Sequence, residues 1–370
     1  MTSPLDAYKT SLDRIAFGEE AKARMTSKLE AAVDAYAEKP TRAAGSPKDV
    51  GRHRPGRRLA LAACLAAALA VCGGGAAVAA GVLPNPADVL SDVFSEAPAQ
   101  TDLLDDIGRP VGASATSNGV TVTAEAVVGD RSNYAVVYSV EFDDPSVLEG
   151  IEPNENGTLP LVADASSRVD GTLSGGGAAW FYDADPEDSA IQYAEAMGFD
   201  TWNGEGIVGR TMRFSLSGIR AVEDAGETRA IATGTWDLKF EMNYVDTTVN
   251  LSAGQKTAWQ GADVTVDAVA VSSVGLRVDY TVDRQIGDLG PSGKMSDEAK
   301  AEMEAVVGLP VTVAFADGTT FEATNANSSA MKQDDGTSIV TKTATYDRIV
   351  AASDIESVIV GGVEIPANAA

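Results

Sequence analysis

Cysteine and histidine are scarce in this chain, with two cysteines and one histidine in 370 residues. Cys64 and Cys72 lie inside a long uncharged run, where we expect them to be small apolar fillers, and His53 lies in a basic segment just before it. The residues beyond this run therefore contain neither thiol nor imidazole. This excludes a disulfide scaffold and the Ser/His and Cys/His nucleophile systems for that part of the chain.

Carboxylates are plentiful, but no pair of them is singled out as a general acid and base. The acidic segment 183–188 (DADPED) lacks the full calcium-loop pattern, so we expect a solvated turn. Gly175–Gly177 is not followed by a helix start that could hold phosphate, and we expect a flexible turn. We expect Trp180, Trp202, Trp236 and Trp259 to belong to the core. The sequence predicts no enzyme activity, no cofactor and no metal site.

Residues 59–83 form an uncharged run of 25 residues, LALAACLAAALAVCGGGAAVAAGVL. A helix of this length spans about 37 Å, enough to cross a hydrocarbon core about 30 Å thick with some tilt. A buried core helix rarely runs so far without polar residues, and a signal peptide would begin near Met1. We therefore predict a transmembrane helix over 59–83.

The charges on the two sides of this run differ. Arginines at 52, 54, 57 and 58 precede it, whereas Asp88, Asp92 and Glu96 follow it and no basic residue occurs before Arg109. Residues 1–58 hold 12 of the 28 basic and 8 of the 54 acidic residues, which leaves 16 basic and 46 acidic residues for the remainder. The positive-inside rule predicts a single-pass protein with a cytoplasmic N-terminus and an exported C-terminal part. The acidic exported part argues against nucleic acid as a partner there.

An exported part of this size without disulfides is more typical of a bacterial plasma membrane than of a eukaryotic surface. We therefore expect the C-terminal domains to lie outside a bacterial cell.

Residues 1–39 contain two short amphipathic helical patterns, separated at Gly18. Ser3 and Pro4 provide a helix start, and Pro40 ends the second pattern. So short a segment buries little core, so it is either a weakly ordered tail or a docking element whose apolar faces bind a partner. The candidate partner-binding residues are Tyr8, Leu12, Ile15, Met25, Leu29, Val33 and Tyr36.

Residues 40–58 are rich in proline, glycine and arginine, which indicates a flexible basic linker against the anionic inner leaflet. Within the predicted span, Gly73, Ala77 and Gly81 recur every four residues. This spacing would allow two spans to pack closely as a homodimer. Gly73, Gly74 and Gly75 weaken the helix locally and are candidate sites for intramembrane cleavage.

We expect residues 84–118 to form a stalk that is punctuated by prolines. From Gly119 onward the hydrophobic period becomes two, as in Trp236, Leu238 and Phe240 alternating with Asp237 and Lys239. Several such strands with glycine and aspartate turns indicate antiparallel β-sandwiches. We also expect a helix through Val307 and a type I′ hairpin at Asp317–Gly318.

The strand pattern occurs twice along the chain. The segment 120–127 (VTVTAEAV) resembles 264–271 (VTVDAVAV), and 134–141 (YAVVYSVE) resembles 276–283 (LRVDYTVD). The two matches share nearly the same offset along the chain. We therefore predict two tandem β-sandwiches, at 119–255 and 256–370, in a mainly β fold.

Two segments resemble parts of a known protein family. They are 7–33 (AYKTSLDRIAFGEEAKARMTSKLEAAV) and 107–142 (IGRPVGASATSNGVTVTAEAVVGDRSNYAVVYSVEF). With the basic linker and single span, this layout resembles an uncharacterised, anti-sigma-factor-like family of membrane proteins in Gram-positive bacteria. The resemblance implies immunoglobulin-like exported domains. The chain lacks the His-x-x-x-Cys-x-x-Cys motif of zinc-type anti-sigma factors, which argues against that subclass.

Two functions remain open from the sequence. In the first, the cytoplasmic helices bind a sigma factor and the exported domains sense an envelope signal through an unknown ligand. In the second, the exported domains are a cell-surface binding or structural module, and the N-terminus is only a tail.

Overall fold

The computed structural model describes residues 84–94, 98–201, 205–223, 227–286, 297–324 and 326–367, all of which belong to one compact unit. The predicted cytoplasmic helices (1–39), basic linker (40–58) and span (59–83) lie outside this part of the chain. Among the described residues, no helix combines the length and the apolar character needed to cross a membrane. Strands account for 56% of the described part, which confirms the prediction of a mainly β protein.

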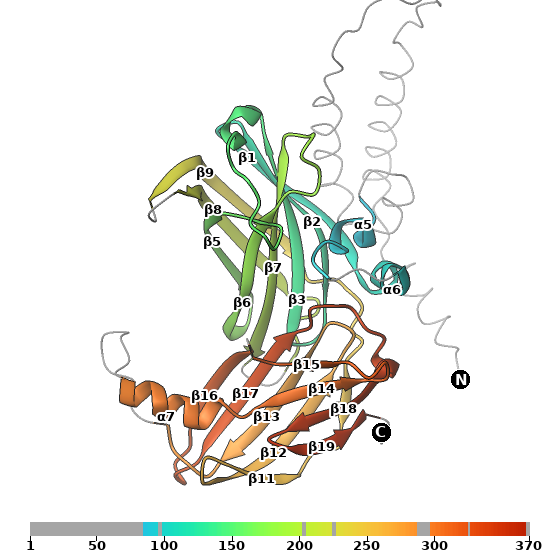
Figure 1. The fold of residues 1–370 in the computed structure, drawn as a ribbon, viewed down its shortest axis with the longest axis vertical. Helices are drawn as coiled ribbons and strands as arrows, with labels where there is room; N and C mark the ends of the chain where they lie inside the picture. Colours follow the sequence, from blue (N-terminus) through green and yellow to red (C-terminus); the bar gives the residue numbers. More distant parts are fainter. Residues whose placement is uncertain are drawn as a thin grey trace, which may run out of the picture. The chain divides into compact units, whose positions relative to one another are not determined.

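The first sandwich, β1–β9, consists of two antiparallel sheets preceded by two short helices (Figure 1). The larger sheet has the order β1-β2-β3-β7-β6-β4, and the smaller has the order β5-β8-β9. The elements are α5 (Pro86–Leu90), α6 (Pro98–Ile107), β1 (Arg109–Ser117), β2 (Val120–Gly129), β3 (Asn133–Phe142), the short helix η1 (Pro145–Leu148), β4 (Thr158–Leu159), β5 (Leu161–Val169), β6 (Thr172–Tyr182), β7 (Ala190–Thr201), β8 (Thr211–Val222) and β9 (Thr228–Glu241).

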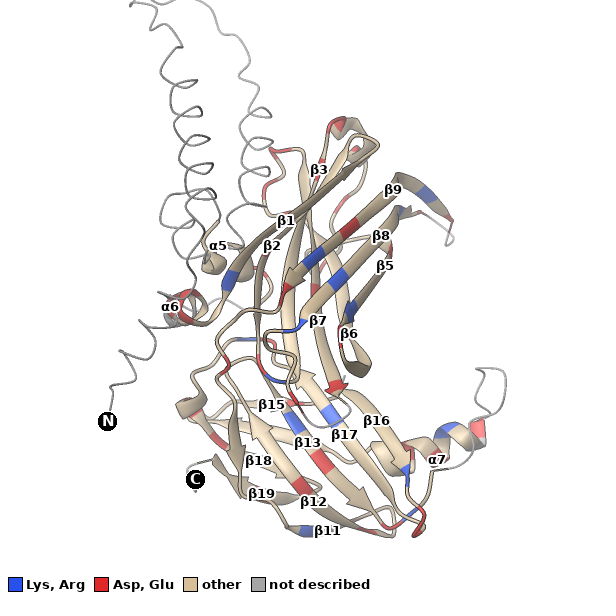
Figure 2. Ribbon diagram, turned by 180° about the vertical axis from the view of Figure 1, so that it is seen from behind, with Lys and Arg blue, Asp and Glu red and all other residues tan. Residues whose placement is uncertain are grey.

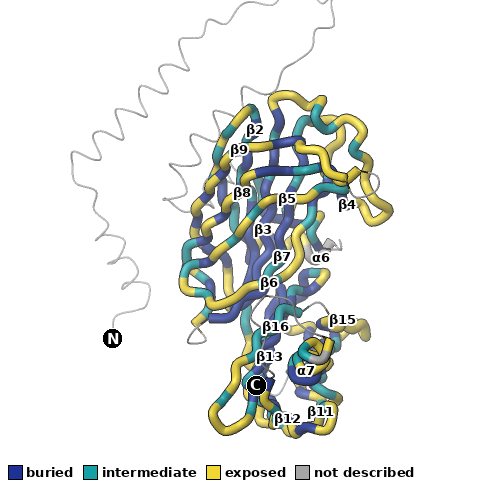
Figure 3. The backbone as a smooth tube through the Cα atoms, turned by 90° about the vertical axis from the view of Figure 1, so that its left-hand side faces the viewer, coloured by how far each residue is buried: buried dark blue, intermediate teal, exposed yellow. Residues whose placement is uncertain are grey.

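The core of the first sandwich forms where the inner faces of its two sheets meet. Tyr138 of β3 stacks on Phe214 of β8 with ring centroids 4.1 Å apart. On β9, fully buried Trp236 donates from its indole nitrogen to the Val120 carbonyl oxygen at 3.0 Å. On β9, exposed Asp237 lies between buried Trp236 and Leu238, as the period of two predicts. Figure 2 shows charged residues along β9, and Figure 3 shows buried and exposed residues along the strands of this sandwich.

The second sandwich, β10–β19, has one sheet ordered β10-β12-β13-β17-β16, with β11 also pairing β12, and another ordered β15-β14-β18-β19. Its helix α7 ends at Val307, where the sequence predicted a helix end. The elements are β10 (Val249–Leu251), β11 (Lys256–Trp259), β12 (Ala262–Val271), β13 (Gly275–Val282), α7 (Asp297–Val307), β14 (Val311–Phe315), β15 (Thr320–Glu322), β16 (Asn327–Lys332), β17 (Ser338–Thr345), the short helix η3 (Ala352–Asp354), β18 (Ile355–Val360) and β19 (Val363–Pro366).

The two sandwiches repeat one connectivity. The β2–β3 and β12–β13 hairpins each pair next with a strand that comes later in the chain, β7 and β17. Both hairpins carry a bulge at the same place, between Ala124 and Ala126 and between Val266 and Ala268. The second sequence match, 134–141 with 276–283, has the register of this structural repeat, whereas the first, 120–127 with 264–271, is displaced from it by two residues. Residues at matching positions of these two hairpins, such as Ala124 and Val266, are repeat-equivalent.

Residues 84–118 do not form the separate stalk that the sequence suggested. Ala87 and Leu90 of α5 are fully buried, and β1 pairs with β2 from Arg109 onward. Pro86 is the first residue of α5, a position where its missing amide hydrogen costs nothing. Pro110 lies on the edge strand β1. The sequence predicts a stalk punctuated by prolines, whereas in the structure Pro86 and Pro110 lie inside regular elements.

The prediction of a flexible turn at Gly175–Gly177 is also wrong, because these residues lie within β6. A Cβ atom on Gly175 would come within 2.3 Å of the Phe199 ring, and one on Gly177 within 2.0 Å of the Ala196 carbonyl oxygen. Glycine is therefore required here by close approach inside the sheet.

The hairpin around Asp317–Gly318 is present, between β14 and β15, but it is not type I′. Gly318 has a φ of +80°, whereas Asp317 is not among the residues with positive φ. A type I′ turn needs positive φ at both central residues. The Asp317 carboxylate instead accepts a hydrogen bond from the Thr319 amide at 2.9 Å, which stabilises a longer connection.

Candidate functional site

The residues that the sequence singled out lie outside the described part of the chain, so their roles stay predictions. They are the partner-binding candidates Tyr8, Leu12, Ile15, Met25, Leu29, Val33 and Tyr36, and the span candidates Gly73, Gly74, Gly75, Ala77 and Gly81. The candidate site that the structure does describe is the junction between the two sandwiches.

The junction begins with the turn of the β2–β3 hairpin. Asp130 follows β2, and its Oδ1 accepts hydrogen bonds from the amides of Ser132 and Asn133 at 2.6 and 2.7 Å. A short polar side chain stabilises a tight turn when it accepts hydrogen bonds from the amides two and three residues later. The local sequence Gly-Asp-Arg-Ser-Asn therefore supplies the acceptor that its own turn needs.

The repeat-equivalent turn of the second sandwich uses a hydroxyl group in the same way. Ser272 follows β12, and its Oγ accepts from the amides of Val274 and Gly275, each at 3.0 Å. Asp130 and Ser272 are repeat-equivalent. The same turn is therefore stabilised by a carboxylate acceptor in the first hairpin and by a hydroxyl acceptor in the second.

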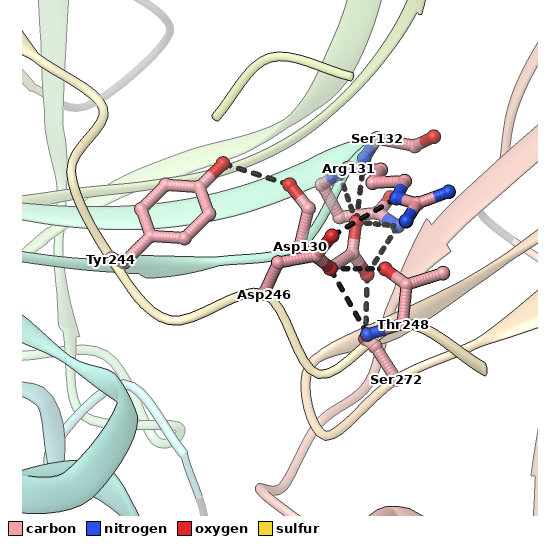
Figure 4. Close-up of polar contacts among 8 residues, drawn as sticks. Asp130, Arg131, Ser132, Tyr244, Asp246, Thr248 and Ser272 are labelled. Atoms are coloured by element: carbon pink, nitrogen blue, oxygen red, sulfur yellow. Dashed lines mark hydrogen bonds and ion pairs between the residues drawn. The ribbon is translucent and has the colours of Figure 1, made fainter. Parts of the chain in front are cut away.

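The two turns contact each other directly (Figure 4). Ser272 donates its hydroxyl hydrogen to Asp130 Oδ2 at 2.6 Å, and Asn133 Nδ2 donates to the Leu276 carbonyl oxygen at 3.3 Å. Tyr244, which follows β9, donates its hydroxyl hydrogen to the Asp130 carbonyl oxygen at 2.8 Å. Asp130 thus connects its own turn, the end of the first sandwich and the second sandwich.

Burial dominates the electrostatics of Asp130, which is only 3% exposed. Burial raises the pKa of this carboxyl group, because desolvation penalises the charged form, and hydrogen bonds from Ser272, Ser132 and Asn133 act in the opposite direction. Asn133 is 1% exposed, and its Oδ1 has no hydrogen-bond partner within the described residues. The junction is therefore a closely packed polar network.

Ion pairs surround this network. Arg131 Nε lies 2.9 Å from an Asp246 carboxylate oxygen, and Arg277 lies 2.9 Å from Asp279 and 3.2 Å from Asp200. The Arg277–Asp200 pair joins β13 to β7 and so adds a second polar link between the sandwiches. A small cavity of about 160 Å³ lies among Asp130, Arg131 and Arg277.

A second buried carboxylate, Glu195 of β7, lies inside the first sandwich. Ser167 donates to its carboxylate at 2.7 Å, and the hydroxyls of Tyr134 and Tyr193 donate at 3.2 and 3.4 Å. Burial raises the pKa of the Glu195 carboxyl, although these hydrogen bonds oppose the rise. Since hydroxyl groups surround it on several sides, it stabilises the packing of β3, β5 and β7.

No three acidic, histidine or cysteine side chains in the described part of the chain lie close enough to hold a metal ion. The acidic segment 183–188 forms a turn that its own carboxylates stabilise, since Asp183 and Asp185 accept from the amides of Asp185 and Glu187, each at 3.1 Å. The junction can couple the two sandwiches mechanically.

The helices that follow residue 83 pack against both sandwiches. Leu90 of α5 and Leu104 of α6 belong to a buried cluster with Ala126 of β2. The same cluster contains Val274, from the turn after β12, and Ile349, which follows β17. Neither this packing nor the junction was predicted from the sequence, although the offset of the match between 134–141 and 276–283 pairs Asp130 with Ser272.

Comparisons with known proteins extend these observations only in part. The search of curated proteins gave no match. Among solved structures, the chain is similar to "The crystal structure of the conserved domain protein from Bacillus anthracis", with 15% sequence identity over 67% of this chain and 74% of that chain, and a TM-score of 0.43. Residues 52–142, which run from the basic linker to the end of β3, match a family model described as "Domain of unknown function (DUF4179)".

Proposed function

We propose that this chain is a membrane-anchored regulator of the anti-sigma-factor-like type. Residues 1–39 bind a sigma factor in the cytoplasm, residues 59–83 cross the plasma membrane once, and the immunoglobulin-like β domains sense an envelope signal outside the cell. The charge asymmetry across the uncharged run supports this orientation.

The observation that carries the proposal is the packing of α5 and α6. Pro86, the first residue of α5, comes three positions after the end of the predicted span. Leu90 and Leu104 pack in a cluster to which the first sandwich contributes Ala126 and the second contributes Val274. A change in how the sandwiches meet would therefore alter the packing of the segment that continues into the span. Such coupling is what a sensor needs to transmit an external event.

The family match gives further support, because the matched residues include both the predicted span and the first hairpin in one continuous region. It begins at Arg52, before the uncharged run, and ends at Phe142, the last residue of β3. The match itself assigns no activity.

The test is capture of a sigma factor by the full chain. Membranes that contain the chain with a tag at Met1 would be solubilised, and proteins retained with it would be identified by mass spectrometry. We expect a sigma factor with the wild type and its loss when Leu12 and Leu29 are both replaced by aspartate, since charged groups cannot enter an apolar groove.

Protease added to intact protoplasts supplies the matching topology test. It should remove residues beyond about 84 and spare the tag at Met1. Loss of the tag, or capture of no sigma factor by the wild type, would leave the cell-surface binding or structural module as the function.

A further inference from the structure

A cleft of about 590 Å³ lies between α5 and the outer face of the larger sheet of the first sandwich. Val89 of α5, Val137 of β3 and Ala190 of β7 contribute apolar surface to it. The cleft is built wholly from residues 84–192, so it belongs to the first sandwich and is separate from the junction around Asp130.

The charged residues that line this cleft are all acidic. No lysine or arginine occurs among the lining residues within the described chain, whereas six carboxylates do. They are Asp88 and Asp92 on and after α5, Glu125 on β2, Glu141 on β3, and Glu187 and Asp188 before β7. Glu125 and Glu141 are half-buried, and the other four are exposed at the rim. A ligand in this cleft would meet negative charge from the helix, the sheet and the loop.

The bulge in β2 explains why a carboxylate lies beneath α5. The register of β2 against β3 shifts between Ala124 and Ala126, so Glu125 is the extra residue. Ala126 packs in the cluster under α5, and Glu125 lines the adjoining cleft. Burial first, and the neighbouring Glu141 second, raise the pKa of Glu125 to about 7.

The second sandwich provides a direct comparison for this bulge. Its repeat-equivalent residue, Asp267, is exposed and accepts a hydrogen bond from Thr281 at 2.7 Å. No hydrogen bond to Glu125 occurs within the described residues. The same bulge therefore carries a paired surface carboxylate in one sandwich and a more buried carboxylate without a donor in the other.

Tyr182, at the end of β6, contributes its aromatic ring to the wall of the cleft. It lines the cleft, it is 9% exposed, and its hydroxyl has no hydrogen-bond partner in the described structure. Burial and the charge of Asp92 raise its pKa, so this hydroxyl stays protonated at neutral pH. The hydroxyl oxygen itself is closed off from the cleft, so a ligand there would meet the ring and not the hydroxyl.

We propose that this cleft binds an extended organic cation with at least two protonated amines, of the polyamine class. Amine groups several bonds apart can pair with carboxylates on opposite walls, while the methylene chain between them covers Val89, Val137 and the Tyr182 ring. A single metal ion fits less well, because no three of the carboxylates come together as ligands in the described part of the chain.

The occupied cleft would join α5 to the sheet through one ligand. Since α5 follows the predicted span, the bound cation would stabilise the membrane-proximal packing. This regulatory consequence rests on the proposed function, whereas the binding itself does not.

The test is titration of the full chain, purified in detergent, with spermidine by calorimetry at about 0.1 M salt. We expect Glu125→Gln together with Glu141→Gln to weaken binding about tenfold or more, since two charge-assisted hydrogen bonds are lost. The control Asp267→Asn removes the repeat-equivalent carboxylate and should leave the affinity within about twofold. A second variant pair at the exposed rim, Asp88→Asn with Glu187→Gln, should weaken binding without affecting the core.

Each alternative outcome overturns the proposal. Equal affinity in the wild type and both cleft variants would show that spermidine does not bind there. An equal loss in Asp267→Asn would show non-specific attraction to an acidic surface. Tight binding of Ca²⁺ that excludes spermidine would assign the cleft to a metal. These results leave sigma-factor capture by residues 1–39 unaffected, so the two proposals fail separately.

Discussion

Replacing Asp130 by alanine should destabilise the turn of the first hairpin and its contact with the second sandwich together. The substitution leaves the buried amides of Ser132 and Asn133 without their acceptor. The Ser272 hydroxyl can turn to the Gly275 carbonyl oxygen, 3.2 Å away, so its loss is smaller. At about 1–3 kcal/mol for each buried unsatisfied donor, the expected loss is about 2–6 kcal/mol.

A double-mutant cycle separates the contact between the sandwiches from the turn itself. Asp130→Ala, Ser272→Ala and the double variant would be compared by urea unfolding of a chain that starts at Pro84, which keeps every described core residue. A hydrogen bond to a charged group predicts a coupling energy of about 1.5–3 kcal/mol. Asp130→Asn, which keeps an acceptor for both amides, is the matched control and should cost less than alanine.

Two results of the cycle would contradict a role for Asp130 in coupling the sandwiches or in satisfying the two amides. If the two single effects add to the double effect within about 0.5 kcal/mol, the Asp130–Ser272 bond does not couple the sandwiches. If Asp130→Asn costs as much as Asp130→Ala, the loss does not come from the two amides.

Three further predictions concern other parts of the chain. The folded-state pKa of Glu125 is about 7 against an ordinary 4.5, so its contribution to stability is present at low pH and is lost as pH rises through 7. Glu125→Gln should therefore match the wild type near pH 4 and exceed its unfolding free energy at pH 8 by about 3 kcal/mol; equal urea midpoints at pH 8 would contradict this. Trp236→Ala should cost about 3–5 kcal/mol, because it empties a fully buried site and leaves the Val120 carbonyl oxygen without its donor; a fall of less than about 1 kcal/mol in urea unfolding would exclude a core role. Replacing Leu12 and Leu29 with aspartate should raise transcription of the regulon of any captured sigma factor, measured with a reporter; unchanged transcription would count against the anti-sigma proposal.

The alternating strands could be predicted from the sequence where the inward residues are apolar and the outward residues are polar. On β9, Trp236 and Leu238 are buried while Asp237 is exposed, as the pattern requires. The repeat was visible for the same reason, since Tyr138 and Tyr280 occupy equivalent inward positions of two hairpins.

The stalk was predicted wrongly because a proline can either end or begin a regular element. It ends a helix or strand in one context and begins a helix in another, and Pro86 begins α5 only because Ala87 and Leu90 can pack on the sheet. The junction could not be predicted because Asp130 and Ser272 lie far apart in the sequence, and each accepts hydrogen bonds within its own turn. The contact between these two turns depends on how the sandwiches pack against each other, and no local sequence pattern encodes this packing.

The pairing of Asp130 with Ser272 has a consequence for how a duplicated domain can be assembled. Repeat-equivalent residues that contact each other would be identical in a symmetric homodimer of one sandwich. Two aspartates in these positions would place two buried negative charges against each other, and two serines would lack the charged acceptor. Joining the copies in one chain lets each diverge, so that one supplies a carboxylate and the other a hydroxyl. Covalent linkage thus allows a heterotypic bond at a place where symmetry would enforce repulsion or a weaker contact.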